Sequence, residues 1–358
     1  MSVLVTIERV LLNETSSRLV EFRLKFGISL GNCAEGLTFP IPFANGADIV
    51  GLGVEAEKLG YDSVWANDHI TTQLYVKKLW GKSPNYYEPL MILSYIASRT
   101  KRITLGTGVI VLPNRNLPIL AKEVSTLDVL SGGRMILGIG SGAYKEEFEA
   151  MHPGLSIGER SRVFEESLEG LCSLLTQSTA SYDGKYVKFK EIELFPKPEQ
   201  HPFPIYIGGN YHKSFERVSK YARGWLPGML TPDEISSMLS QLRASCQRHG
   251  RSLSEIDVAP QLTACVGKTS QEAIKKFKDS AWYKHLESLR TSTLRGKGES
   301  DLTTRGLIGS VDEVIDKIEK YIDVGVTSFP HLKFPANRFE EEKRGIEFFA
   351  KEVMPSFR

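Results

Sequence analysis

The sequence predicts an α/β fold, a (β/α)8 barrel (TIM barrel) with a β-hairpin inserted after its fourth helix. Strand-like and helix-like segments alternate along most of the 358 residues, and repeated βα units require a parallel sheet with right-handed crossovers. Eight segments are predicted as strands with a helix after each, and eight is the number that closes a barrel. A doubly wound open sheet is the alternative. It needs a nucleotide fingerprint after the first strand, and Gly31-Asn32-Cys33-Ala34 is not one.

The first half of the chain supplies four of the βα units. In the first predicted helix, Ile49, Leu52 and Ala56 fall on one face and Gly60 follows as a stop. In the third, Pro118 stands in the first turn. Strands are expected at 24–30, 62–66, 103–111 and 135–139, and helices at 48–59, 89–98, 118–130 and 159–176.

A hairpin then interrupts the alternation. Asp183-Gly184 is typical of a tight turn, and Val187, Phe189 and Ile192 alternate after it. The remaining strands are expected at 205–207, 225–226, 256–266 and 326–329, with helices at 213–222, 232–249, 271–289, 310–325 and 339–353. Residues 291–306 are rich in Gly, Ser, Thr and charge, which predicts a mobile loop. Residues 1–23 are expected to form an N-terminal extension, and 24–358 a single barrel domain.

Composition excludes several classes of function. The 45 basic and 43 acidic residues balance, so neither nucleic acid nor an anionic membrane is expected as a partner. The four cysteines form no CxxC pair, which indicates reduced thiols in a cytoplasmic protein without a metal site. No signal peptide is predicted, and the longest apolar run is too short to span a bilayer. No GxSxG, HExxH or P-loop occurs.

Three predicted strands end in glycines, at 106–108, 138–142 and 208–209. Ligands of such barrels lie at the C-terminal strand ends, and a flat ring or a phosphate can touch backbone that lacks a Cβ. A tight βα turn without a ligand is the alternative for each stretch alone; together they predict one ligand site. The candidate binding residues are Gly106, Thr107, Gly108, Val109, Gly140, Ser141, Gly142, Tyr144, Gly208, Gly209 and Asn210.

Asp68 and His69 are the only adjacent acid and imidazole at a predicted strand end. An imidazole there could transfer a proton or bind a reduced cofactor ring, and the carboxylate could orient its neighbours. The alternative is a loop pair that caps Thr71 and Thr72. His331, after the last strand, has the same ambiguity. Asp68 and His69 are the candidate catalytic residues.

Several segments together resemble the bacterial luciferase-like monooxygenase superfamily. The resemblance spans about 24–335 and is carried by YDSVWANDH (61–69), LGTGV (105–109) with Pro113, LAKEVSTLDVLSGGR (120–134), LGIGSG (137–142) with EEF (146–148), IYIGGN (205–210) and YARGWLP (221–227). It implies a (β/α)8 barrel that uses either reduced FMN with dioxygen or the deazaflavin coenzyme F-420 (F420). The wording LDVLSGGR and the Pro-containing loop after strand three are most similar to the F420-dependent branch.

This resemblance implies an oxidoreductase that transfers a hydride between F420 and a small organic substrate that the sequence does not identify. The alternatives are an FMN-dependent monooxygenase, with a possible flavin reductase partner, and a cofactor carrier without catalysis. It also implies a non-proline cis bond at Gly108-Val109 behind the ring, His69 beside the ring's reactive face, and Gly208–Asn210 on the phosphate. Ala143 stands where some sugar dehydrogenases carry a catalytic Glu, so sugar-phosphate oxidation is not expected. A homodimer through helices two and three is typical of the family.

Overall fold

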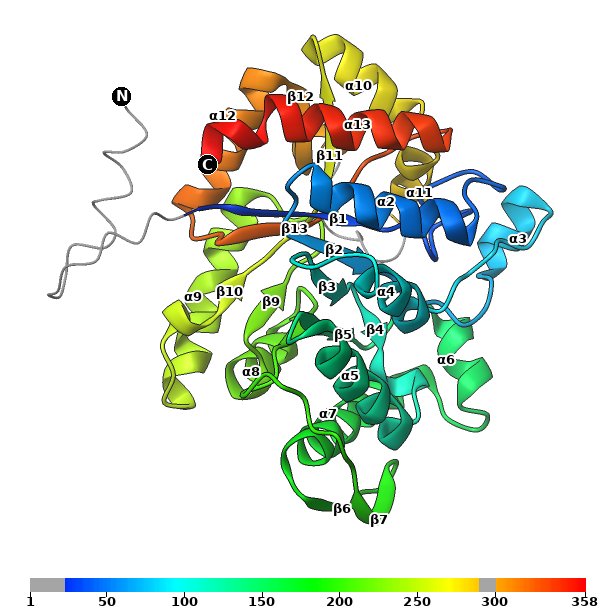
Figure 1. Cartoon of the computed structure of the whole chain (residues 1–358), viewed down its shortest axis with the longest axis vertical. Coiled ribbons are helices and arrows are strands. Elements are labelled where there is room, and N and C mark those ends of the chain that lie inside the picture. The colour runs from blue at the N-terminus through cyan, green and yellow to red at the C-terminus, as the bar shows by residue number, and fades with distance from the viewer. Residues whose placement is uncertain (1–22, 290–300) are drawn as a thin grey trace, which may run out of the picture.

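The computed structural model of the chain describes residues 23–289 and 301–358 (Figure 1). The predicted N-terminal extension, apart from its last residue, and residues 291–300 of the predicted mobile loop lie outside the described residues. Within the described ranges, no helix has both the length and the apolar character needed to cross a membrane. All four cysteines are free thiols.

A parallel sheet forms the centre of the molecule, and its strand order is that of a barrel. The first strand is β1 (Lys25–Ser29). On one side of it the strands follow in the order β2 (Ser63–Ala66), β3 (Thr104–Thr107), β5 (Met135–Gly140), β8 (Ile205–Gly208), β9 (Gly224–Leu226) and β10 (Asp257–Val258). In the other direction they are β13 (Ser328–Lys333), β11 (Gln261–Gly267) and β12 (Gly306–Ser310).

The stretch 257–267 joins the two ends of this sheet. Its first part, β10, pairs with β9, and its second part, β11, pairs with β13. The backbone N–H of Thr327 also donates to the carbonyl of Val258 at 3.0 Å. Pro260 stands between the two parts and has no N–H for a strand ladder, which explains the break. The predicted (β/α)8 architecture is thus confirmed, with the seventh barrel strand divided in two.

Helices surround the sheet, and several begin with side-chain caps. Reciprocal capping boxes open α2 at Asn45, α9 at Thr231 and α12 at Ser310. The helices are α2 (Gly46–Lys58), α3 (Leu74–Trp80), α4 (Pro89–Ala97), α5 (Leu117–Ser131), α6 (Lys145–Met151), α7 (Arg160–Thr176), α8 (His212–Tyr221), α9 (Pro232–Arg248), α10 (Ser270–Lys278), α11 (Ala281–Leu289), α12 (Val311–Asp323) and α13 (Phe339–Glu352).

A separate antiparallel pair, β6 (Thr179–Asp183) and β7 (Lys188–Glu193), follows α7 at the bottom of Figure 1. Glu166 of α7 holds the turn between the two strands, because its carboxylate accepts hydrogen bonds from the backbone N–H groups of Lys185, Tyr186 and Val187. This is the hairpin expected around Asp183-Gly184.

The helices α3 and α6 were not predicted, and, besides the divided seventh strand, three further local features differ from the sequence-based expectation. The helix expected at 271–289 is two helices, because Ser280 interrupts it: its hydroxyl donates to the Phe277 carbonyl and accepts from the Tyr283 N–H. The strand expected at 103–111 ends at Thr107 and resumes as β4 (Ile110–Val111). The strand β12 was not predicted, because glycines bracket its two apolar residues, Leu307 and Ile308.

Candidate active site

The ends of three barrel strands converge on one side chain, that of Val109. A Cβ on Gly140, at the end of β5, would lie 2.7 Å from Val109 Cγ2, and one on Gly208, at the end of β8, would lie 3.2 Å from Cγ1. Val109 itself follows β3 through a cis peptide bond with Gly108. The predicted convergence of glycine-ended strands and the predicted cis bond are therefore both confirmed.

The glycines at this rim first serve the packing of the protein. A Cβ on Gly106 would lie 2.3 Å from the Trp65 ring, and one on Gly108 would lie 2.3 Å from the His331 ring. Gly142 has φ +82° and faces Val111. No larger residue fits these positions without displacing a neighbour, so the glycines would be needed even without a ligand.

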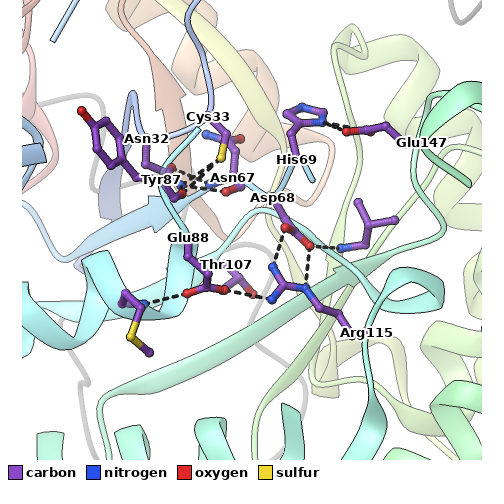
Figure 2. A network of polar contacts seen from close by, with 12 residues as sticks. Asn32, Cys33, Asn67, Asp68, His69, Tyr87, Glu88, Thr107, Arg115 and Glu147 are labelled. Atoms are coloured by element: carbon purple, nitrogen blue, oxygen red, sulfur yellow. Dashed lines mark hydrogen bonds and ion pairs between the residues drawn. The ribbon is translucent and has the colours of Figure 1, made fainter. Parts of the chain in front are cut away.

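His69 follows β2 and forms a buried pair with Glu147 of α6 (Figure 2). Its Nδ1 lies 3.2 and 3.1 Å from the two carboxylate oxygens, and the side chains are 16% and 3% exposed. Gln73 supports the pair, with its Nε2 3.4 Å from Glu147 Oε1. The Nε2 of Gln73 also lies 3.1 Å from His69 Nδ1. Glu147 and Gln73 thus both engage Nδ1, which leaves Nε2 to exchange a proton.

Asp68 points away from His69, toward Arg115 (Figure 2). Its oxygens accept from Arg115 Nη2 at 2.5 Å, from Arg115 Nε at 3.1 Å and from the Val111 N–H at 2.9 Å. Arg115 also donates to Glu88 at 2.9 Å. Burial alone would lower the pKa of Arg115, but the two carboxylates outweigh it and raise the pKa. The Asp68 carboxylate is thus engaged in fixing the loop after β4 to the end of β2.

Aromatic side chains border His69. The Tyr144 and Tyr86 rings each lie 5.5 Å from its imidazole, centroid to centroid. Burial raises the pKa of Tyr144 to about 12, so its phenol stays neutral. Beyond Tyr144 stands Tyr75, whose hydroxyl lies 2.6 Å from His285 Nδ1. This contact joins Tyr75 of α3 to His285 of α11.

The loop after β8 combines a structural clamp with an open helix end. Asn210 exchanges two hydrogen bonds with the backbone of Gly228, at 2.8 and 2.9 Å, and so ties this loop to the one after β9. Helix α8 begins just beyond, and its N-cap Tyr211 makes no side-chain cap hydrogen bond. Arg160 of α7 interacts with Tyr211; its Nη1 is buried and has no hydrogen-bond partner within residues 23–289 and 301–358.

The remaining predicted site residues have mixed surroundings. Thr107 is fully buried and donates to the Gly138 carbonyl at 2.7 Å. Ser141 and Gly209, which has φ +135°, are half-buried. His331 is fully buried in the barrel, and burial, with Lys333 nearby, lowers its pKa to about 3. His331 therefore lies below the rim where the strand ends meet.

Sequence reasoning missed Glu147, Gln73, Arg115 and Arg160. Each reaches the site from a helix or loop, where no fixed spacing links it to a strand end. The segment EEF (146–148), which contains Glu147, supports the family resemblance but does not by itself indicate a partner for His69. Paired spacing could have drawn attention to Gln73, which stands four residues after His69.

Comparison with known proteins places this site in a family. A model described as luciferase-like monooxygenase matches residues 24–328. The F420-dependent glucose-6-phosphate dehydrogenase of Amycolatopsis mediterranei is 27% identical over 331 residues, which are 87% of this chain and 94% of that protein. The oxygenase component of flavin-dependent trigonelline monooxygenase from Acinetobacter baylyi is 23% identical over 327 residues, 84% of this chain and 87% of that protein.

A solved structure agrees on the fold. The coenzyme F420-dependent tetrahydromethanopterin reductase from Methanopyrus kandleri superimposes with a TM-score of 0.71 at 24% identity, covering 94% of this chain and 100% of that one. The family model matches most of the chain, and the barrel is shared. The chain belongs to the luciferase-like monooxygenase family, and its relatives here are flavin- or F420-dependent oxidoreductases.

Proposed function

We propose that the protein transfers a hydride between F420 and a small organic substrate at the C-terminal mouth of the barrel. The observation that carries this proposal is the His69–Glu147 pair, buried beside the rim where three strand ends meet at Val109. An F420-dependent dehydrogenase is similar over nearly its whole length. The sequence LDVLSGGR at 127–134 supports the F420-dependent branch of the family as well.

The residues at the rim fit a flat cofactor with a phosphate. The half-buried Val109 and the Gly108-Val109 peptide offer backbone and an apolar side chain to a ring. Arg160 has a buried Nη1 with no partner in the described parts of the chain, and the start of α8 lacks a side-chain cap. Free N–H groups at a helix start and a guanidinium both suit a phosphate. Arg160, Gly208 and Gly209 would hold that end of the cofactor.

His69 would move the proton that accompanies the hydride. When bound, a deazaflavin supplies a two-electron hydride, so the protein has to bind, orient and protonate. Glu147 holds the Nδ1 side of the imidazole, which leaves Nε2 to give or take the proton. Asp68 would act as a positioning residue, because its oxygens already bind Arg115 and the Val111 N–H.

The substrate class differs from that of the sugar-phosphate relative. Ala143 occupies the place of the expected catalytic Glu and cannot serve as an acid. Glu147, four residues on, contacts His69 instead. We therefore expect an alkene, imine, carbonyl or alcohol substrate other than glucose 6-phosphate.

Titration of the purified protein with F420 and with FMN tests the cofactor assignment. The expected result is saturable quenching of tryptophan fluorescence by F420 and much weaker quenching by FMN. Substrates would then be screened by the absorbance of F420 as it is oxidised or reduced. Binding of FMN alone would overturn the proposal.

An FMN-dependent monooxygenase is the second candidate, supported by similarity to the trigonelline enzyme over 84% of this chain. That function needs reduced flavin and dioxygen, with a possible reductase partner. Oxygen consumption that depends on reduced FMN and on an added organic substrate would favour it.

We also propose a homodimer formed through α4 and α5. Both helices are buried against the barrel on one side, yet four large apolar side chains on them are exposed: Met91, Tyr95, Ile119 and Leu130. Such grouping is typical of a protein interface. Light scattering should show a dimer that Tyr95→Glu dissociates. Leu79→Glu, at an exposed apolar site on α3, should leave the dimer intact; a monomeric wild type would refute the assignment.

A further inference from the structure

The inner face of β13 carries two polar side chains, His331 and Lys333. His331 points into the barrel, because its ring lies against Gly108 and is 6.3 Å from the Trp65 ring, centroid to centroid. Side chains two residues apart in a strand share a face. Lys333 therefore projects from the same face, nearer the C-terminal end of the strand, where the mouth of the barrel lies.

Lys333 sits on an aromatic platform. Its Nζ lies 4.5 Å from the centre of the Trp282 ring. The Trp282 Nε1–H donates to Thr263 at 2.7 Å, and Thr263 is the register partner of Lys333 on β11. The ring is thus held by α11, which carries it, and by β11, while β13 carries the lysine above it. A cation over an indole face is attracted to it, but its hydrogen-bond donors still need acceptors.

No carboxylate pairs with Lys333 within the described ranges 23–289 and 301–358. The acids at the site are engaged elsewhere, since Glu147 faces His69 and Asp68 faces Arg115. Burial, reinforced by Lys333, lowers the pKa of the nearby His285 to about 3, so that imidazole is neutral. Burial lowers the pKa of Lys333 itself to about 8, which reflects an ammonium with few compensating contacts.

This ammonium is separate from the proposed phosphate site of the cofactor. The phosphate loop follows β8, and Lys333 ends β13; β9 and the stretch 257–267 stand between them in the barrel. Lys333 nevertheless belongs to the same mouth as His69, because a continuous series of ring contacts joins the two. The Trp282 ring beneath Lys333 stacks on His285, His285 stacks on Tyr75, and Tyr144 lies between Tyr75 and His69.

We propose that Lys333 binds an anionic group of the substrate, a carboxylate or a phosphate, and so selects negatively charged substrates. This inference deepens the function proposed above, because it assigns the anion to the substrate of the same site. An anion on the side of the ammonium away from the Trp282 ring would accept the N–H donors that the ring leaves unused. The distance between the bound anion and His69 would determine which atom of the substrate lies next to His69 and the cofactor ring.

Calorimetric titration with inorganic phosphate tests this binding without turnover. Arg160→Met is introduced first, to remove the other expected phosphate site. In that background phosphate should bind saturably, and Lys333→Met should weaken binding at least ~10-fold, as expected for loss of a charged hydrogen bond. Lys284→Met, an exposed lysine on the same helix as Trp282, is the matched control and should change nothing. Lys333→Arg, which keeps the charge, should retain most of the binding.

Two results would overturn the inference. One is phosphate binding that is absent, or unchanged by Lys333→Met, in a protein whose thermal unfolding midpoint matches the control. The other is loss of phosphate binding when saturating F420 or FMN is added, which would assign Lys333 to the cofactor. Phosphate binding that persists when the cofactor is bound supports the assignment of Lys333 to the substrate. A failure of the redox proposal would appear separately, as absence of F420 binding with phosphate binding intact.

Discussion

The Nδ1 atom of His69 lies 3.2 and 3.1 Å from the two carboxylate oxygens of Glu147, so an imidazole at the end of one strand is oriented by an acid from a short helix. The two residues are 78 positions apart in the chain. This pairing leaves the Nε2 atom of His69 available for chemistry. It also gives His69 a different partner from its neighbour Asp68, which binds Arg115.

Substitution of Glu147 should disturb His69 without removing it. In Glu147→Gln the carboxylate at Nδ1 becomes an amide that can present either its C=O acceptor or its NH2 donor, so the imidazole should populate both neutral tautomers. Proton-detected nitrogen NMR of the ring measures this directly. Turnover should fall about 10–100-fold, against about 10²–10⁴-fold for His69→Ala. Glu146→Gln is the control, because Glu146 contacts the Leu74 N–H instead. Full turnover of His69→Ala would favour a non-catalytic carrier.

Disruption of the Asp68–Arg115 pair should cost stability. Asp68→Asn leaves Glu88 as the one partner acid of Arg115 among residues 23–289 and 301–358. Breaking a buried ion pair from one side costs about 3–5 kcal/mol, which should lower the unfolding midpoint by on the order of 10 °C. Calorimetry measures this. Asp183→Asn, in the exposed pair with Lys188, should leave the midpoint unchanged. A stable but inactive Asp68→Asn would instead indicate a catalytic carboxylate.

A methyl group at Gly140 should destabilise the protein, because it would collide with the Val109 side chain. The Cβ of Gly140→Ala would lie 2.7 Å from Val109 Cγ2, so we expect a loss of about 1–3 kcal/mol in the free energy of unfolding. The double variant Gly140→Ala/Val109→Ala should recover part of the lost free energy of unfolding, because the two side chains are in contact and their effects are not additive. Gly51→Ala, in α2 with nothing within 4 Å, should gain about 0.5–1 kcal/mol. Simple addition of the Gly140 and Val109 effects would contradict the contact.

Stability should fall as the pH rises because of Glu342. This carboxyl group of α13 is buried, its Oε1 has no hydrogen-bond partner in the described parts of the chain, and burial raises its pKa well above 4.5. The folded protein thus holds a proton that the unfolded chain releases once the pH exceeds the ordinary value. Between that value and the raised pKa, stability falls by at most about 1.4 kcal/mol per pH unit.

The Glu342→Gln variant tests this sign. Its advantage over wild type in the free energy of unfolding should be smallest near pH 4 and should grow toward pH 8, as urea titrations at several pH values would show. Glu340→Gln, on the exposed face of the same helix, should show no such trend. An advantage that shrinks with pH would mean that the acid is ionised in the fold.

The sequence by itself determined the barrel, the strand ends and the position of His69. Apolar periodicity and caps are local, so the βα units and the turn at Asp183-Gly184 follow from neighbouring residues. The break of the seventh strand at Pro260 and the strand β12 were not predicted, because pairing partners decide them.

The tertiary structure decided which polar groups meet. Asp68 and His69 look equivalent in the chain, yet one binds Arg115 and the other Glu147. The glycines that suggested a ligand are also required by Val109, Trp65 and His331. Lys333 became a candidate binding residue only in the folded structure, where β13 places it over Trp282. Contacts between residues far apart in sequence depend on strand order and side-chain direction, and no local pattern contains either.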